Sequence, residues 1–121
     1  MSRSGVSDAD LEDLARLGSF TSLSLLGVTI SNEGLTYVGA LESLERLQLG
    51  MTPVDDRGIL KLTSLKRLRQ LSLSFTAVTD ASVKTLGTMK QLRELDVSGT
   101  AISPEGLAEL RRSLPDCAVD R

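Results

Sequence analysis

Residues 68–86 read Leu-Arg-Gln-Leu-Ser-Leu-Ser-Phe-Thr-Ala-Val-Thr-Asp-Ala-Ser-Val-Lys-Thr-Leu, and they decide the fold because their pattern recurs every 24 residues. Apolar side chains return in the same register four times. A strict repeat of this length predicts a stack of similar coils, each of which buries its apolar side chains against its neighbours. The registers that show the period best are Leu23, Leu47, Leu71 and Leu95; Leu25, Leu49, Leu73 and Val97; and Phe20, Leu44, Leu68 and Leu92.

The period organises almost the whole chain of 121 residues, so we expect one domain over residues 1–121. Leucines in register before the first full copy predict an N-terminal capping helix over about residues 7–17. Four repeats follow over about residues 20–115, and Val119 marks a terminal strand remnant over about residues 117–119. No second cap is evident after this remnant. The C-terminal end therefore either self-associates or belongs to a longer array.

Each repeat predicts a short strand followed by a short helix. Leu71 and Leu73 alternate with polar residues, which is the period of a strand with one buried face. A threonine follows three of the strands, and we expect its hydroxyl to bond backbone groups of the neighbouring coil. A residue suited to capping a helix then precedes apolar residues spaced by three, which indicates short helices that are partly 3₁₀. The threonines are Thr52, Thr76 and Thr100, and the capping residues are Ser31, Asp55, Thr79 and Ser103.

The unit over residues 68–86 resembles a leucine-rich repeat. It is similar to the ribonuclease-inhibitor-like branch and to the bacterial and F-box-associated repeats that read L-x-x-L-x-L-x-x-T/C-x-I-T-D-x-G-L. The resemblance implies an α/β fold, a right-handed leucine-rich-repeat solenoid with a parallel sheet on the concave side and short helices on the convex side. It also implies a non-catalytic protein–protein interaction module that acts as an adaptor, scaffold or assembly subunit. It names no partner, because such repeats serve unrelated ones.

The outward face of the predicted sheet is the first candidate binding surface, because its side chains are not needed for folding. A generic solvated strand face is the alternative, and the sequence does not decide between the two. Met51 and Phe75, just after the strands, either anchor a partner or cover the rim of the core, and we favour the rim. The candidate partner-binding residues are Arg46, Gln48, Met51, Gln70, Ser72, Phe75, Glu94 and Asp96.

A basic edge is the second candidate surface. Residues 57–93 hold eight basic side chains and one acidic side chain, Asp80. Four of the basic residues fall in two registers on the return from helix to strand, so they should share one edge: Lys66, Arg69, Lys90 and Arg93. This edge suggests an alternative function as an accessory subunit of a ribonucleoprotein or nucleic-acid complex. The net charge of −2 and the scarcity of aromatic residues favour a solvated charged rim instead.

Catalytic and cofactor-binding patterns are not found in the sequence. There is no histidine, and neither G-x-x-x-x-G-K-[ST] nor G-x-G-x-x-G occurs, so we expect no cofactor and no metal. The single cysteine, Cys117, cannot form an internal disulfide and is expected to be a buried small residue. No apolar stretch resembles a secretory signal or a membrane span, and we therefore expect a cytoplasmic protein with no membrane partner.

Overall fold

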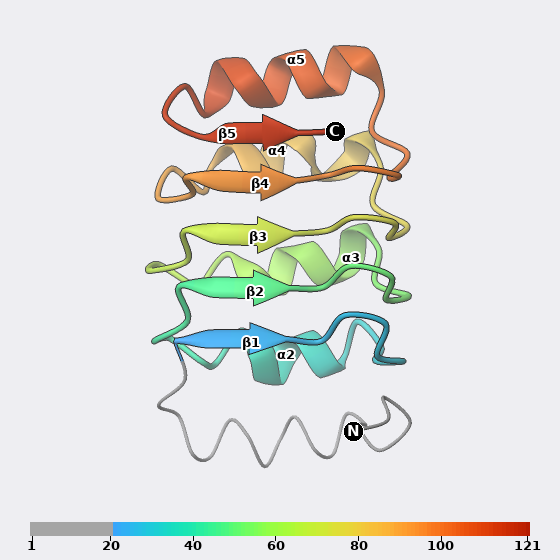
Figure 1. Cartoon of the computed structure of the whole chain (residues 1–121), viewed down its shortest axis with the longest axis vertical. Helices are drawn as coiled ribbons and strands as arrows, with labels where there is room; N and C mark the ends of the chain where they lie inside the picture. The colour runs from blue at the N-terminus through green and yellow to red at the C-terminus, as the bar shows by residue number, and fades with distance from the viewer. Residues whose placement is uncertain (1–20) are drawn as a thin grey trace.

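The computed structural model describes residues 21–121, in which short strands and helices alternate along the chain (Figure 1). The strands form one parallel sheet in chain order, and each strand pairs with the next one along the sequence. The predicted capping helix over residues 7–17 lies outside the described residues. The strands are β1 Ser22–Ser24, β2 Arg46–Gln48, β3 Gln70–Ser72, β4 Glu94–Asp96 and β5 Ala118–Asp120.

The register of the sheet is the 24-residue period itself. Leu47 pairs with Leu71, and Leu71 pairs with Leu95. Val119 pairs with Leu95 in the same way, so the predicted strand remnant is the fifth strand of the sheet, displaced by one residue from its expected bounds. Each period is therefore one coil of a solenoid, and residues 24 apart in sequence are neighbours in space.

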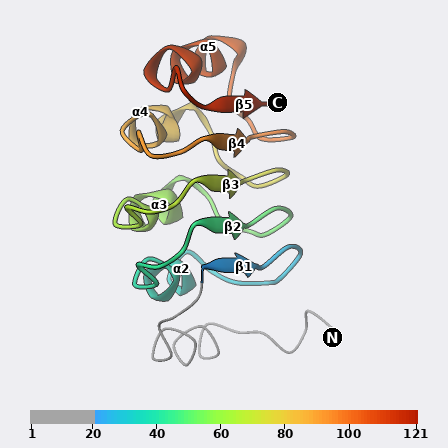
Figure 2. The ribbon, with the colours of Figure 1, turned by 60° about the vertical axis from the view of Figure 1, so that its left-hand side comes forward.

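The helices lie together on one side of the sheet, and the loops that follow the strands project beyond the ends of the strands (Figure 2). Within residues 21–121, most helices have three to five residues and two are 3₁₀, which confirms the prediction of short, partly 3₁₀ helices. The exception is the last one, which has ten residues, with Ser103 as its N-cap and Pro104 in its first turn. The helices are α2 Gly34–Val38, α3 Asp56–Ile59, η2 Leu60–Leu62, η3 Asp80–Ser82, α4 Val83–Gly87 and α5 Pro104–Ser113.

An aliphatic core fills the space between sheet and helices. Its side chains are supplied by the positions that recur every 24 residues, and the core continues from one coil to the next. Leu49 and Leu73 from the strand side are fully buried, as are Leu35 and Leu62 from the helix side. Because every coil contributes the same layer, each apolar side chain stabilises mainly its own coil and the two coils beside it.

The threonines after the strands act within their own coil. The hydroxyls of Thr52 and Thr76 are buried and donate to the carbonyl oxygens of Leu49 and Leu73, at 2.7 Å each. The expectation that these hydroxyls bond the neighbouring coil is therefore wrong. The reason is geometric, because the turn after each strand folds the threonine back onto a carbonyl three residues earlier.

A ladder of side-chain hydrogen bonds joins the coils where the helices begin. The carboxylate of Asp56 accepts bonds from the backbone N–H and hydroxyl of Thr79 (2.8 and 2.6 Å) and from the hydroxyl of Ser82 (2.6 Å). One coil further on, Asp80 accepts bonds from the backbone N–H and hydroxyl of Ser103, at 2.8 and 2.7 Å. These carboxylates satisfy backbone groups at a helix start and tie each coil to the one before it.

Asn32 occupies the same position in the first described coil. Its amide donates to Asp55 Oδ1 (2.7 Å), and its amide oxygen accepts the Asp55 backbone N–H (3.1 Å). The ladder ends at Pro104, which stands in this register but has no side-chain acceptor. Glycine leaves room for two of these contacts, because a Cβ at Gly58 would collide with the side chain of Asn32 and one at Gly106 with the side chain of Asp80.

The outer edge of β5 carries a hydrogen bond from the last helix. Arg111 of α5 donates from Nη2 to the carbonyl oxygen of Val119 at 3.1 Å. This side chain occupies an acceptor on a strand that pairs with β4 only. An edge carbonyl bonded in this way is less available for pairing with another strand.

Candidate functional site

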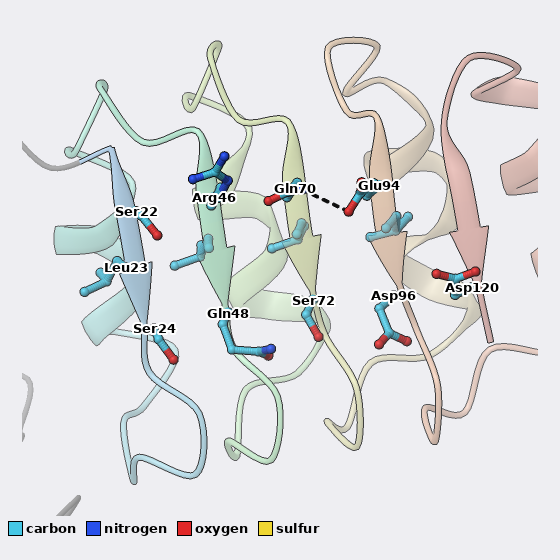
Figure 3. A pocket seen from close by; sticks show the side chains of 13 residues that line it. Ser22, Leu23, Ser24, Arg46, Gln48, Gln70, Ser72, Glu94, Asp96 and Asp120 are labelled. Carbon is cyan, nitrogen blue, oxygen red and sulfur yellow. Dashed lines mark hydrogen bonds between the residues drawn. The ribbon is translucent and has the colours of Figure 1, made fainter.

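The outward face of the sheet forms a shallow groove of about 400 Å³ that spans all five strands. Its lining consists of two rows of polar residues and the row of strand leucines between them (Figure 3). The sheet register places Arg46, Gln70 and Glu94 side by side, and it does the same for Gln48, Ser72 and Asp96. The structure therefore brings together the six sheet residues that the sequence singled out.

Charge is distributed unevenly along this groove. Arg46 on β2 is its cation, whereas Glu94 and Asp96 on β4 and Asp120 on β5 are its anions. Between the two regions, Gln70 donates from its amide to Glu94 Oε1 at 2.9 Å. In the part of the chain that the structure describes, Arg46 and the three carboxylates form no ion pair. The groove is thus positive near one end of the sheet and negative at the other.

In the row formed by Gln48, Ser72 and Asp96, two side chains are turned along their strands toward the loops. Gln48 Oε1 accepts the backbone N–H of Gly50 at 2.7 Å, and Asp96 Oδ1 accepts the backbone N–H of Ser98 at 2.9 Å. Ser98 also donates its hydroxyl to the same carboxylate oxygen. These bonds fix the orientation of both side chains and leave the second oxygen of Asp96 for another donor.

An apolar ridge, formed by Leu26, Met51 and Phe75, borders the groove. It lies on the stacked loops after β1, β2 and β3, where Met51 N–H donates to Ser74 O and Phe75 N–H donates to Ser98 O. Leu26 is 50% exposed, and Met51 and Phe75 are each 60% exposed. The favoured expectation that Met51 and Phe75 cover the rim of the core is therefore wrong. The buried threonine that follows each of them closes the core instead.

Met51 and Phe75 also hold an unfavourable backbone conformation. Their φ angles are +60° and +57°, and the matching positions of the neighbouring coils are glycines, Gly27 at +73° and Gly99 at +70°. The left-handed conformation costs a side chain with a Cβ about 1–2 kcal/mol relative to the right-handed one. Large apolar residues thus stand, exposed, where the fold favours glycine. Such outliers are enriched at functional sites.

The apolar ridge packs over the loop of the following coil. A Cβ at Gly99 would collide with the ring of Phe75, and a Cβ at Gly50 would be 3.0 Å from Leu26 Cδ1. The ring of Phe75 therefore lies across the loop that follows β4, the strand that carries Asp96. This arrangement places an exposed aromatic ring beside the acidic end of the groove.

The predicted basic edge is divided by acidic side chains and backbone contacts. Arg69 and Arg93 are neighbours, since Arg93 N–H donates to Arg69 O at 2.7 Å, but Glu45 and Glu94 line the same small depression. Arg93 Nη1 donates to the carbonyl oxygens of Lys90 and Leu92.

The two lysines of this edge lie in different surroundings. Lys90 Nζ donates to Ser113 O at 2.6 Å, whereas Lys66 borders a separate hollow together with Glu42, Ser64 and Arg67. The edge is basic but offers no continuous row of free cations.

Other chemistry-bearing groups of the described residues stay outside the groove. Cys117 is partly buried, and this burial raises the pKa of its thiol, which disfavours the reactive thiolate. Between residues 21 and 121, no three His, Cys, Asp or Glu side chains are close enough to hold a metal ion. None of the helices in that range is long and apolar enough to cross a membrane.

Sequence reasoning missed one residue of this surface. Asp120 lies in the groove beside Asp96. The signal for Asp120 was its position, one period after Asp96. Leu26 was expected on the outward face, in one register with Gly50, Ser74 and Ser98, and the structure shows that it is exposed at the start of the apolar ridge.

Comparison with known proteins agrees with this architecture. A leucine-rich-repeat family model matches residues 89–110. Among curated proteins, none matches the chain by sequence.

Three of the solved structures with a similar fold illustrate the likeness. A leucine-rich-repeat protein of Leptospira interrogans has 23% identity and a TM-score of 0.59, over 91% of this chain and 33% of that one. Actin-binding site 2 of leiomodin-1 has 20% identity and a TM-score of 0.69, over 88% and 71%. Internalin C2 of Listeria monocytogenes has 24% identity and a TM-score of 0.58, over 94% and 44%.

This chain spans about a third of the Leptospira protein's length and less than half of the internalin's. At these identities the likenesses concern the fold. Together with the 24-residue coils and the parallel sheet, they show that the chain has an α/β solenoid fold of the leucine-rich-repeat type.

Proposed function

We propose that this chain is a non-catalytic protein-binding module, an adaptor, scaffold or assembly subunit, that holds a protein partner on the sheet face and the adjoining apolar ridge. The observation that carries the proposal is the exposure of Met51 and Phe75 in a backbone conformation that glycine adopts in neighbouring coils. Exposed apolar side chains that stabilise the fold poorly are explained by contact with another molecule.

The groove supports the same function. Its polar side chains stand on a rigid sheet, and several are oriented by hydrogen bonds before any partner arrives. Preorganised side chains lose less conformational entropy on binding. Structural neighbours include an actin-binding site of leiomodin-1, which is consistent with binding by this fold.

Two finer assignments belong to this proposal. We place the chain in the ribonuclease-inhibitor-like branch, on the basis of its repeat pattern. We also place it in the cytoplasm, because its single cysteine has no partner for a disulfide.

The test separates a binding role from a structural role of the ridge. In the doubly substituted protein Met51→Gly/Phe75→Gly, the fold gains glycines at positive φ but loses partly buried apolar surface. We expect its free energy of unfolding, measured in urea, to stay within about 1 kcal/mol of the wild-type value. If Met51 and Phe75 covered the rim of the core, their removal would instead lower the free energy of unfolding by several kcal/mol.

Binding is measured on the same variant by quantitative pull-down from an extract of the source organism. Leu60→Ala is the matched control, because Leu60 is 61% exposed but lies on the helical side. Proteins retained by the wild type and by Leu60→Ala should be lost from the glycine variant. Equal retention by all three would show that the ridge is not the binding surface.

A further inference from the structure

Resting on the proposed function, we propose that the partner segment carries a basic side chain that binds between Asp96 and Asp120, next to an apolar side chain that packs against Phe75. The occupant is thus a cationic, apolar segment of a protein. The exposed ridge, the negative charge of the adjoining groove and the short distance between them favour such an occupant.

The anionic part of the site has two carboxylates on paired strands. Asp96 and Asp120 are direct partners in the sheet register, and both side chains project from the same face (Figure 3). Like charges at paired positions of a sheet destabilise it. Within residues 21–121 neither carboxylate forms an ion pair, and Asp96 has one oxygen that accepts no hydrogen bond. A cationic side chain placed between them would remove this repulsion.

Within residues 21–121, three cations of this region are placed or bonded elsewhere. The guanidinium of Arg93 is held by the carbonyl oxygens of Lys90 and Leu92. Arg111 donates to the carbonyl of Val119, and Arg46 stands two strands away on β2. The positive charge that complements the pair therefore comes from the partner.

The apolar part of the site is Phe75. Its ring lies across Gly99, which is three residues after Asp96 in the same coil. Three residues of extended chain cover about 10 Å. An extended partner segment would thus reach both parts when its basic and apolar side chains are within about three residues of each other. Arg46, at the other end of the face, would favour an acidic residue further along the same segment.

The experiment begins with selection of random 12-residue peptides, displayed on phage, against the immobilised full chain. We expect enriched peptides with Lys or Arg within about three residues of Leu, Ile, Met or Phe. The affinity of one enriched peptide is then measured by fluorescence anisotropy. Asp96→Asn/Asp120→Asn should weaken it by about tenfold, and the wild-type affinity should fall with added salt.

The matched control is Asp116→Asn, which removes an exposed carboxylate at the opposite end of β5 and should leave the affinity within about twofold. Circular dichroism of each variant verifies folding. Enrichment of acidic or uncharged peptides, an unchanged affinity of the double variant, or no enrichment would overturn the proposed partner chemistry. So would tighter binding of a single-stranded RNA oligonucleotide at the same surface.

Phe75→Gly separates this failure from failure of the proposed function. If Phe75→Gly abolishes peptide binding while Asp96→Asn/Asp120→Asn does not, the ridge binds protein but its partner is not cationic. If neither the ridge nor the carboxylates affect binding, both proposals are wrong.

Discussion

Asp56 and Thr79 are 23 residues apart in sequence, yet the two carboxylate oxygens of Asp56 accept both the backbone N–H and the hydroxyl of Thr79. One side chain thereby satisfies a free donor at the start of η3 and fixes the distance between two coils. The same relationship, between Asp80 and Ser103, joins the next pair of coils. The coils are therefore connected by polar contacts as well as by the aliphatic core.

Removal of the Asp56 carboxylate should destabilise the stack. Asp56→Ala loses three hydrogen bonds to the next coil, and we expect a loss of about 2 kcal/mol in the free energy of unfolding, measured by urea denaturation. Asp56→Asn is the control, because Asn32 occupies this position in another coil. It should cost less than Asp56→Ala, and an equal loss would contradict the role of the acceptor oxygens.

Stability should also depend on pH through the ladder. Burial raises the pKa of Asp56, but hydrogen bonds from Ser82 and Thr79 outweigh it and hold the pKa below the usual 3.8. The hydroxyl and backbone N–H of Ser103 lower the pKa of Asp80. As the pH falls, these carboxylates therefore take up protons at a higher pH in the unfolded chain than in the folded chain. This contribution to stability is complete well above pH 3.8 and is lost as the pH falls through the lower folded-state values.

The measurement is the urea midpoint at a series of pH values from 6 down to about 3. The wild-type midpoint should fall more steeply in the acidic range than that of Asp56→Asn/Asp80→Asn. Parallel curves for the two proteins would show that other groups cause the acid sensitivity.

Gly99 should tolerate a side chain poorly, and for two separable reasons. Its φ is +70°, and a Cβ would collide with the ring of Phe75. We expect Gly99→Ala to cost about 1–3 kcal/mol in urea denaturation, part of it from the backbone conformation. In the Phe75→Gly background the cost should be smaller, because the collision is gone. Strict additivity of the two substitutions would contradict the packing of Phe75 over Gly99.

The edge of β5 should pair more readily with another molecule when the Arg111 side chain is removed. Arg111→Ala frees the carbonyl of Val119, and we expect more self-association in sedimentation equilibrium at high protein concentration. Arg112→Ala is the matched control, since Arg112 is an exposed neighbour on the same helix that makes no hydrogen bond among the described residues. Equal association of both variants and the wild type would mean that the guanidinium does not protect the edge.

Much of the sheet face was predictable from the sequence, and the ridge was not. Arg46, Gln70 and Glu94 follow from the two-residue period of the strands, which determines the side of the sheet on which a residue lies. The exposure of Met51 and Phe75 depends on the sign of φ in a turn. An apolar side chain in such a turn is buried in some cases and exposed in others. Sequence alone therefore favoured burial of both residues, and the structure places them in solvent.

The sequence by itself determined the coil length, the register of the sheet and the aliphatic core, because these follow from a hydrophobic pattern that repeats at fixed spacing. Only the tertiary structure decided that Phe75 lies across Gly99, that Asp56 binds the next coil and that Asp120 stands beside Asp96. Such contacts join residues from different coils. Their geometry exists only after the coils have stacked, because stacking brings together side chains that are about one period apart in the sequence.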